Sequence, residues 1–426
     1  MKTRREFLGS AATATLAGQL ATAPAGVQAR RPDTTRKRIA IITTVWNQLV
    51  SPAQLVDRFL IGYPRRGEWH VPDAEITAVY VDQRPADDLS RRRAREFKFA
   101  IRPTIAECLS GDGKQLDVDG VLLLVDDGDV ARNPPGQTRP SHDAFFQTII
   151  EMFHKCHRSV PVFSANRLAH SFDKAADMMD RARGASIPLL AGSYLPLTWR
   201  LPDLELPLGC AIDEALVVAG GQTPAMEYHA LEALQSMVER RQGGESGVRS
   251  VQRLEGDAVW RAADSGAWSW KLLRSALSRS DLILGKTLVD ARPQDLLADD
   301  ELQRLVQRPL ACIIRHNDGL KSCLLILNGA VGDFTFAAKL TGDPVIASTQ
   351  FYLPSGPNAA YTACLVAKIE QMMTTGVAPY PAERTLLVGG ILENWLNSGA
   401  QNQAPLTTPQ LAVSYSAPRG SHFCRD

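Results

Sequence analysis

The sequence lacks two features that often identify a protein class: a regular cysteine pattern, and a long apolar run beyond its first residues. Its 426 residues include seven cysteines, an odd number, with no C-x-x-C pair. Such spacing is typical of neither a disulfide framework nor a zinc site, and most of these cysteines have apolar neighbours, as small buried side chains do. The seven are Cys108, Cys156, Cys210, Cys312, Cys323, Cys364 and Cys424. No stretch of about 18 apolar residues follows residue 29, so no transmembrane helix is expected in the mature chain.

The sequence also lacks an excess of charge of either sign. Lys and Arg together number 47, and Asp and Glu number 46. Three of the basic residues (Lys2, Arg4 and Arg5) and one acidic residue (Glu6) lie in the first 29, so the remainder is nearly neutral. A neutral chain gives no electrostatic reason to bind nucleic acid or an anionic membrane, and neither is expected as a partner.

The first 29 residues have the organisation of an export signal. Arg4 and Arg5 precede Phe7 and Leu8, an uncharged stretch rich in Ala and Thr covers residues 9–25, and small residues follow at 21–23 and 27–29. This pattern resembles the bacterial twin-arginine signal, which is read by an export machinery that carries folded proteins. The alternative is an ordinary secretory signal that contains two arginines. The resemblance implies an exported protein, periplasmic or extracellular, that folds in the reducing cytoplasm.

Residues 30–205 alternate between apolar runs and amphipathic segments. The apolar, β-branched runs predict buried strands, and the segments between them predict helices. Expected strands cover 38–42, 75–81, 118–125, 160–163 and 187–191, and expected helices cover 51–61, 88–97, 104–109, 141–156 and 171–183. A Gly- and Pro-containing loop is expected at 62–73. This repeated alternation predicts a Rossmann-like parallel sheet, in which ligands bind at the carboxyl ends of the strands.

Residues 206–398 have a different pattern of predicted elements, because strand-like runs follow one another more closely. Strands are expected at 215–219, 248–254, 311–315, 322–327, 334–340 and 346–352, and helices at 225–240, 268–280, 359–374 and 382–396. Strands in succession predict an α+β domain with a largely antiparallel open sheet and helices on one face. Residues 399–426 are polar and are expected to form an irregular C-terminal tail.

Three segments resemble the Gfo/Idh/MocA family of NAD(P)-dependent oxidoreductases. Residues 160–193 resemble the stretch around the Glu-Lys-Pro motif of that family, residues 225–241 resemble its histidine-bearing helix, and residues 361–398 resemble its C-terminal helix–loop–helix. Their order and spacing cover most of the mature chain. The resemblance implies a two-domain fold, bound NAD or NADP, a sugar or polyol substrate, and a homo-oligomer.

The catalytic residues that the resemblance implies are His229, Asn166 and Arg167. His229 keeps the family histidine, which would accept a proton from a hydroxyl group. Asn166 stands where the family has lysine, and asparagine cannot titrate; Arg167 retains a positive charge at the next position. Ala225 replaces the family aspartate. The alternative for His229 is a hydrogen-bonded core histidine.

The cofactor-binding candidates lie at the ends of the first three predicted strands. Thr43 and Thr44 open the first strand-to-helix turn, which has no glycine from residue 43 to residue 55 and so lacks the G-x-G-x-x-G cradle for a pyrophosphate. Asp82 follows the second strand, where an acid can bind ribose hydroxyls, although it could equally be a surface turn residue. Asp126 follows the third strand. With Asp127 and Asp129 it forms an acidic cluster that more often indicates a solvated loop than a metal site, so no metal is predicted.

Tyr194, Trp199 and Arg200 are the substrate-binding candidates, because they follow the last strand of the predicted parallel sheet. Trp199 could stack on a sugar ring, while the alternative for all three is packing between the domains. Two functions therefore remain open. One is an exported oxidoreductase that transfers a hydride between NAD(P) and a sugar or polyol hydroxyl. The other is a family member without redox activity that acts as a carbohydrate-binding or scaffold protein, as the missing glycines and lysine suggest.

Overall fold

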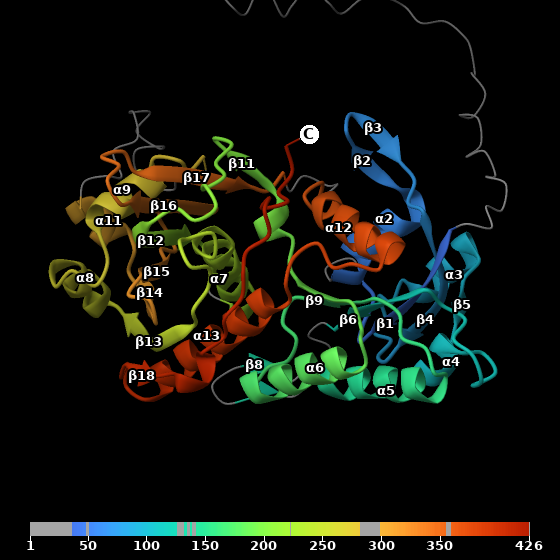
Figure 1. Cartoon of the computed structure of the whole chain (residues 1–426). Helices are drawn as coiled ribbons and strands as arrows, with labels where there is room; N and C mark the ends of the chain where they lie inside the picture. The colour runs from blue at the N-terminus through green and yellow to red at the C-terminus, as the bar shows by residue number, and fades with distance from the viewer. Residues whose placement is uncertain are drawn as a thin grey trace, which may run out of the picture. The chain divides into compact units, whose positions relative to one another are not determined.

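The structure is a computed structural model of the chain (Figure 1). It describes residues 36–47, 51–125, 132–133, 137–138, 142–221, 223–281, 299–354 and 359–425. The predicted signal segment, residues 1–29, lies outside the described residues. Within the described residues no helix combines the length and the apolar character needed to cross a membrane.

The first sheet has six strands, all parallel, in the order β10-β9-β6-β1-β4-β5. The strands are β1 (Lys37–Thr43), β4 (Ala74–Val81), β5 (Ala100–Ile101), β6 (Gly120–Leu124), β9 (Val162–Ala165) and β10 (Leu189–Gly192). In β1 the side chains of Ala40 and Ile42 pack into one core, and those of Ile39 and Ile41 pack into the core on the opposite face. A strand buried on both faces must be apolar at every position, which is the pattern that predicted it. The Rossmann-like sheet is confirmed.

Helices cover both faces of this sheet, as Figure 1 shows. On one face lie α4 (Ile105–Leu109), α5 (His142–Lys155) and α6 (Phe172–Gly184). On the other lie α2 (Ser51–Ile61) and α12 (Thr362–Thr375), with α3 (Ser90–Phe97) at its edge. The apolar face of α12, including Leu365 and Ile369, packs on the strands although α12 comes from the C-terminal part of the chain. The first sheet is therefore completed by a helix from the far end of the sequence.

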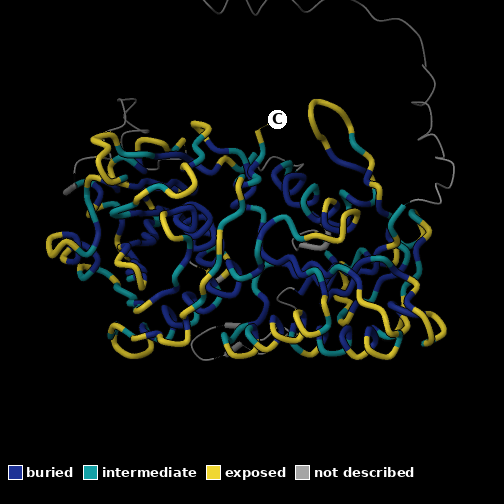
Figure 2. Tube along the Cα trace, viewed as in Figure 1, coloured by how far each residue is buried: buried dark blue, intermediate teal, exposed yellow. Residues whose placement is uncertain are grey.

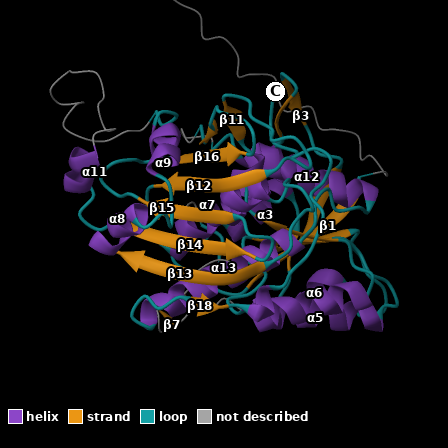
Figure 3. Cartoon of the chain, turned by 60° about the vertical axis from the view of Figure 1, so that its left-hand side comes forward, coloured by secondary structure: helices purple, strands orange, loops and turns teal. Residues whose placement is uncertain are grey.

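The second sheet has eight strands in the order β11-β17-β16-β12-β15-β14-β13-β18 (Figure 3). The strands are β11 (Trp199–Leu201), β12 (Ile212–Ala219), β13 (Val248–Glu255), β14 (Leu310–His316), β15 (Lys321–Ile326), β16 (Phe334–Leu340), β17 (Ala347–Tyr352) and β18 (Leu406–Thr407). The pair β12–β15 is parallel and the other pairs are antiparallel. The largely antiparallel second sheet is thus confirmed.

Helices lie on both faces of the second sheet, not on one face as the sequence suggested. One face carries α7 (Pro224–Val238) and α13 (Glu383–Ala400), and the other carries α8 (Asp257–Asp264), α9 (Trp270–Leu277) and α11 (Asp299–Leu305). In β12, Val217 faces the first group, and Leu216 and Val218 face the second. Because β12 is apolar on both sides, both sides need a cover.

The predicted loop at 62–73 contains a β-hairpin of β2 (Tyr63–Arg65) and β3 (Glu68–His70). Its two turn residues, Arg66 and Gly67, have φ angles of 54° and 76°. A two-residue turn with positive φ at both positions matches the right-handed twist of a hairpin, which explains why so short a segment forms one. Figure 2 shows the tip of this hairpin exposed, in contrast to inner strands of the two large sheets such as β1 and β12, which are mostly buried.

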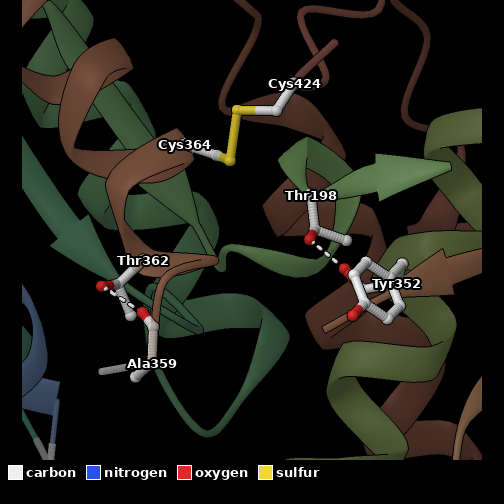
Figure 4. Close-up of a disulfide and its surroundings, with 6 residues drawn as sticks. All are labelled: Thr198, Tyr352, Ala359, Thr362, Cys364 and Cys424. Carbon is white, nitrogen blue, oxygen red and sulfur yellow. Dashed lines mark hydrogen bonds between the residues drawn. A yellow bond between two sulfur atoms is a disulfide. The ribbon is translucent and has the colours of Figure 1, made fainter. Parts of the chain in front are cut away.

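The C-terminal tail is tied to the rest of the chain by a disulfide, which the spacing of the cysteines did not predict. Cys424 forms a disulfide with Cys364 of α12, with 5.9 Å between their Cα atoms (Figure 4). The two are 60 residues apart in sequence, so local spacing gave no sign of the pair. The tail also contributes β18 and the 3-10 helix η2 (Pro409–Leu411). The remaining elements are β7 (Arg132–Asn133), β8 (Gln137–Thr138) and the 3-10 helix η1 (Leu195–Leu197).

Candidate functional site

Helix α7 of the second domain is held against the carboxyl edge of the first sheet by buried hydrogen bonds. Glu232 of α7 accepts one hydrogen bond from the Ser193 amide at 2.9 Å and one from the Ser193 hydroxyl at 2.5 Å. Ser193 directly follows β10. Burial raises the pKa of Glu232 to about 7, although the hydrogen bonds from Ser193 act in the opposite direction. The carboxylate therefore links the helix to the end of a strand.

His229 lies three residues before Glu232, so both side chains are on neighbouring positions of one helix face. The ring centroid of Tyr194 is 5.1 Å from that of His229 and 4.4 Å from that of Tyr361. His229 is only 8% exposed, and burial lowers its pKa to about 4. The buried Nδ1 of His229 has no hydrogen-bond partner among the described residues. A neutral imidazole with an unused ring nitrogen can exchange a proton with a hydroxyl group.

Asn166 stands at the same sheet edge, at the end of β9. Its φ angle is +58°, a left-handed conformation that asparagine tolerates better than most residues. The backbone amide of Asn166 donates to the Gly192 carbonyl at 3.0 Å, and the backbone carbonyl of Asn166 accepts from the Tyr228 hydroxyl at 3.1 Å. The Tyr228 hydroxyl therefore links Asn166 to α7, the helix that also carries His229.

Arg167 is half-buried beside the start of α5. Its charge contributes to lowering the pKa of His142 to about 3, with burial of that imidazole as the larger cause. The positive charge of Arg167 thus acts on a buried, neutral histidine that the sequence did not single out.

The first strand-to-helix turn does not fit the phosphates of a dinucleotide in the usual way. Thr43, Thr44 and Trp46 are buried, and the Trp46 ring is stacked on Phe99 with 5.9 Å between centroids. The Thr43 hydroxyl lies 2.8 Å from the carbonyl oxygens of both Val45 and Leu124. A phosphate cradle needs backbone amides at the surface with no side chains in front of them. The described part of this turn has no glycine, and its residues Thr43, Thr44 and Trp46 are directed into the protein.

Asp82 is better placed for a ribose than the turn is for phosphates. It is exposed at the end of β4, beside the end of β1, where its amide donates to the Thr43 carbonyl at 3.0 Å. Its carboxylate accepts a hydrogen bond from the Tyr80 hydroxyl at 2.9 Å. Asp126, like Asp127 and Asp129, lies outside the described residues. Within the described part of the chain, no three His, Cys, Asp or Glu side chains gather as metal ligands would.

Trp199 and Arg200 have surroundings of their own. Trp199 lines a separate cavity formed by the β2–β3 hairpin, α12 and the tail. Arg200 is buried, with its guanidinium 4.1 Å from the Phe423 ring centroid, and burial lowers its pKa to about 9. It donates a hydrogen bond to the Leu204 carbonyl at 3.0 Å. Among the predicted substrate residues, Tyr194 has a ring contact with His229.

Sequence reasoning missed Ser193, Glu232 and Tyr361. A signal for Glu232 was present, because α7 is apolar around it and a carboxylate on such a helix needs a buried partner. Nothing in the sequence identifies Ser193 as that partner, since the two lie 39 residues apart. Tyr361 immediately precedes α12, and its contact with Tyr194 depends on how α12 returns to the first sheet.

Comparison with known proteins identifies the fold class. The structure resembles GenD2 from gentamicin A biosynthesis in complex with NAD, with a TM-score of 0.52 and 12% identity over 89% of this chain and 98% of that one. It resembles a probable dehydrogenase from Thermotoga maritima, with a TM-score of 0.51 and 10% identity over 88% and 99%. A third is myo-inositol dehydrogenase from Lactobacillus casei in complex with NAD(H) and myo-inositol, with a TM-score of 0.50 and 11% identity over 87% and 96%.

These similarities show that the chain has the two-sheet fold of the compared dehydrogenases. They extend over nearly the whole length of the compared chains. No family model matches the sequence, and no curated protein matches it. At such low identity the similarity shows the fold, while activity depends on the residues at the site.

Proposed function

We propose that this protein is an oxidoreductase that acts on a hydroxyl group of a sugar or polyol at the carboxyl edge of the first sheet. The observation that carries the proposal is the unpartnered, buried Nδ1 of His229 beside Tyr194. A buried polar atom without a partner costs free energy, and a hydroxyl of a bound molecule would satisfy it. The fold supports the class, since compared structures contain NAD or NAD(H), one of them together with myo-inositol.

His229 has the protonation state that the proposal requires. With its pKa lowered to about 4, the imidazole is neutral at pH 7 and can accept the proton that an alcohol loses on oxidation. A nicotinamide dinucleotide would supply the hydride acceptor. The described first turn does not provide its phosphate cradle, so a bound dinucleotide would need contacts of another kind.

The first experiment is a measurement of bound nucleotide. Folded protein purified from the cytoplasm is denatured, and released NAD(H) or NADP(H) is quantified by absorbance and mass. We expect near-stoichiometric dinucleotide, and we expect His229→Asn to abolish polyol oxidation with little effect on the nucleotide content. The matched control is His154→Asn, on the exposed face of α5. An equal loss of activity in both variants would contradict the role of His229.

A second candidate function is favoured by the buried Trp46 and by the filled turn around it. In this alternative the protein keeps the fold and binds a carbohydrate, alone or as a scaffold, without redox chemistry. If this alternative holds, the purified protein contains no nucleotide. Its melting temperature is then unchanged by added NAD(P) and raised by myo-inositol or glucose. Near-stoichiometric dinucleotide would eliminate this alternative.

We also propose export through the twin-arginine pathway, to the periplasm or the cell exterior. The paired Arg4 and Arg5 support it. The disulfide between Cys364 and Cys424 supports an oxidising destination, because structural disulfides persist mainly outside the cytoplasm. A homo-oligomer remains a prediction. Because helices of the described chain cover both faces of the second sheet, such an assembly would use another surface, and light scattering on the purified protein would detect it.

A further inference from the structure

A cavity of about 320 Å³ lies apart from His229, between the β2–β3 hairpin, α12 and the C-terminal tail. Trp199 of β11 forms part of its wall. Ligand-binding cavities usually measure about 300–1,000 Å³, so it has room for one small molecule. Asn166, Tyr194 and His229 are not among its lining residues.

The charged lining residues of the cavity are positive. Arg65 and Arg66 come from the hairpin, and Lys368 comes from the middle of α12. None of the described lining residues is an aspartate or a glutamate. His422 of the tail also lines the cavity; burial and then the positive charge of Lys368 lower the pKa of its imidazole. The cavity is therefore suited to an anion.

The glutamate of α12 is engaged outside the cavity. One carboxylate oxygen of Glu370 accepts from the Tyr63 hydroxyl at 2.6 Å, and the other accepts from the Asp73 amide at 2.8 Å. The His70 ring nitrogen Nε2 is 2.9 Å from the same carboxylate. The hydroxyl of Tyr63 is thus turned towards Glu370, while Tyr63 itself contributes to the cavity wall.

Trp199 supplies the accessible stacking surface, because arginine side chains cover the ring of the other lining aromatic residue in the tail, Phe423. Trp199 is half-buried, so part of its indole remains accessible from the cavity side. Phe423 is buried, and its ring centroid lies 4.1 Å from the guanidinium carbons of both Arg200 and Arg425. A ring that stacks on such a surface gains van der Waals contact in addition to the charge interaction.

The tail wall of the cavity is fixed in place. Figure 4 shows the bond from Cys424 of the tail to Cys364 of α12, and both residues line the cavity. The Cys424 amide donates to the Leu197 carbonyl at 2.8 Å, and Arg425 pairs with Asp203 at 2.9 Å. These contacts hold Phe423 and His422 in position before any ligand arrives, which reduces the ordering cost of binding.

We propose that this cavity binds a small ring-shaped molecule that carries an oxyanion, such as a sugar acid or a sugar phosphate. Arg65, Arg66 and Lys368 surround the oxyanion, and the ring packs on Trp199. Both kinds of ligand carry an oxyanion on a ring. The oxyanion is a carboxylate in a sugar acid and a phosphate ester in a sugar phosphate. The site is independent of the proposed oxidoreductase function, because it shares none of the residues that carry that function.

The test is calorimetric titration of the mature, disulfide-bonded protein at low salt with glucuronate, glucose 6-phosphate and glucose. At least one of the two anions should bind at least about tenfold more tightly than glucose, because a hydrogen bond to a charged group is stronger than one to a neutral hydroxyl. The anion that binds more tightly shows whether the cavity prefers a carboxylate or a phosphate ester. Anions that bind no better than glucose would overturn the proposal.

Substitutions of the lining residues test whether the anion binds in this cavity. Lys368→Gln and, separately, Arg65→Gln should each weaken anion binding about tenfold, whereas Arg91→Gln, on the exposed face of α3, should leave it unchanged. Arg65 lies on the exposed hairpin, so its replacement keeps the test valid if Lys368→Gln folds poorly. The proposal is refuted if all three variants bind equally, or if His229→Asn alone abolishes anion binding.

Discussion

The Ser193 hydroxyl lies 2.5 Å from a carboxylate oxygen of Glu232, which joins the end of the last parallel strand to helix α7. The residue before Ser193 is Gly192, with φ at +123°, and a Cβ atom there would overlap the same carboxylate. A glycine is therefore required for Glu232 to approach the strand. Because His229 is three residues from Glu232, this contact also sets the position of the candidate catalytic ring.

We expect Ser193→Ala to destabilise the protein by about 1–3 kcal/mol, because it leaves a buried carboxylate without its hydroxyl donor. The loss should be greater at pH 8.5 than at pH 6. Ser193 stabilises the ionised form of Glu232, whose pKa is raised to about 7, and that form predominates only at the higher pH. Urea melts at both pH values measure the effect, with Ser265→Ala, on the exposed end of α8, as control. A pH-independent loss would contradict this account.

Glu227→Gln is expected to stabilise the protein at pH 8.5 by about 1–3 kcal/mol and to have little effect at pH 5. Burial raises the pKa of Glu227 to about 7, and one of its carboxylate oxygens has no partner among the described residues. Because the pKa of Glu227 is raised by folding, its contribution to stability is fully present below the pKa of the unfolded chain. That contribution is lost as the pH rises through 7. Thermal melts against the exposed control Glu151→Gln test this, and equal shifts in both variants would refute it.

Cys424→Ser should lower the free energy of unfolding by about 2–4 kcal/mol, since the disulfide closes a long loop and restricts the unfolded chain. Cys156→Ser, which replaces a half-buried free thiol, is the matched control and should have a smaller effect. Urea denaturation under non-reducing conditions compares the two. If a thiol reductant destabilised Cys424→Ser as much as the unaltered protein, the disulfide would not be the cause.

The combined change Arg4→Lys and Arg5→Lys should retain the protein in the cytoplasm, because the twin-arginine machinery recognises the paired guanidinium groups. Fractionation of cells that express the full chain, followed by immunoblotting, measures the distribution. Lys2→Arg serves as the control, since it alters a neighbouring charge-bearing residue and leaves the pair intact. Export of the double variant at the normal level would show that another route is used.

Several elements could be predicted from the sequence because their signals are local. The apolar run at 38–42 predicted a strand buried on both faces, and β1 has side chains in two cores. The helix expected at 171–183 is α6, and Ser171 caps it by accepting from the Lys174 amide at 3.5 Å. The hairpin at 63–70 was missed because its strands are three residues long and contain a proline and charged side chains.

The sequence by itself determined the order of strands and helices, the class of both sheets, and His229 as the leading candidate residue, because hydrophobic periodicity, capping and a motif act over a few neighbouring residues. Only the tertiary structure decided the partners. Three pairs of partners lie far apart in sequence: Ser193 and Glu232, Cys364 and Cys424, and the β2–β3 hairpin and α12. Their contacts depend on how the chain crosses between the two sheets, and no local pattern records that path.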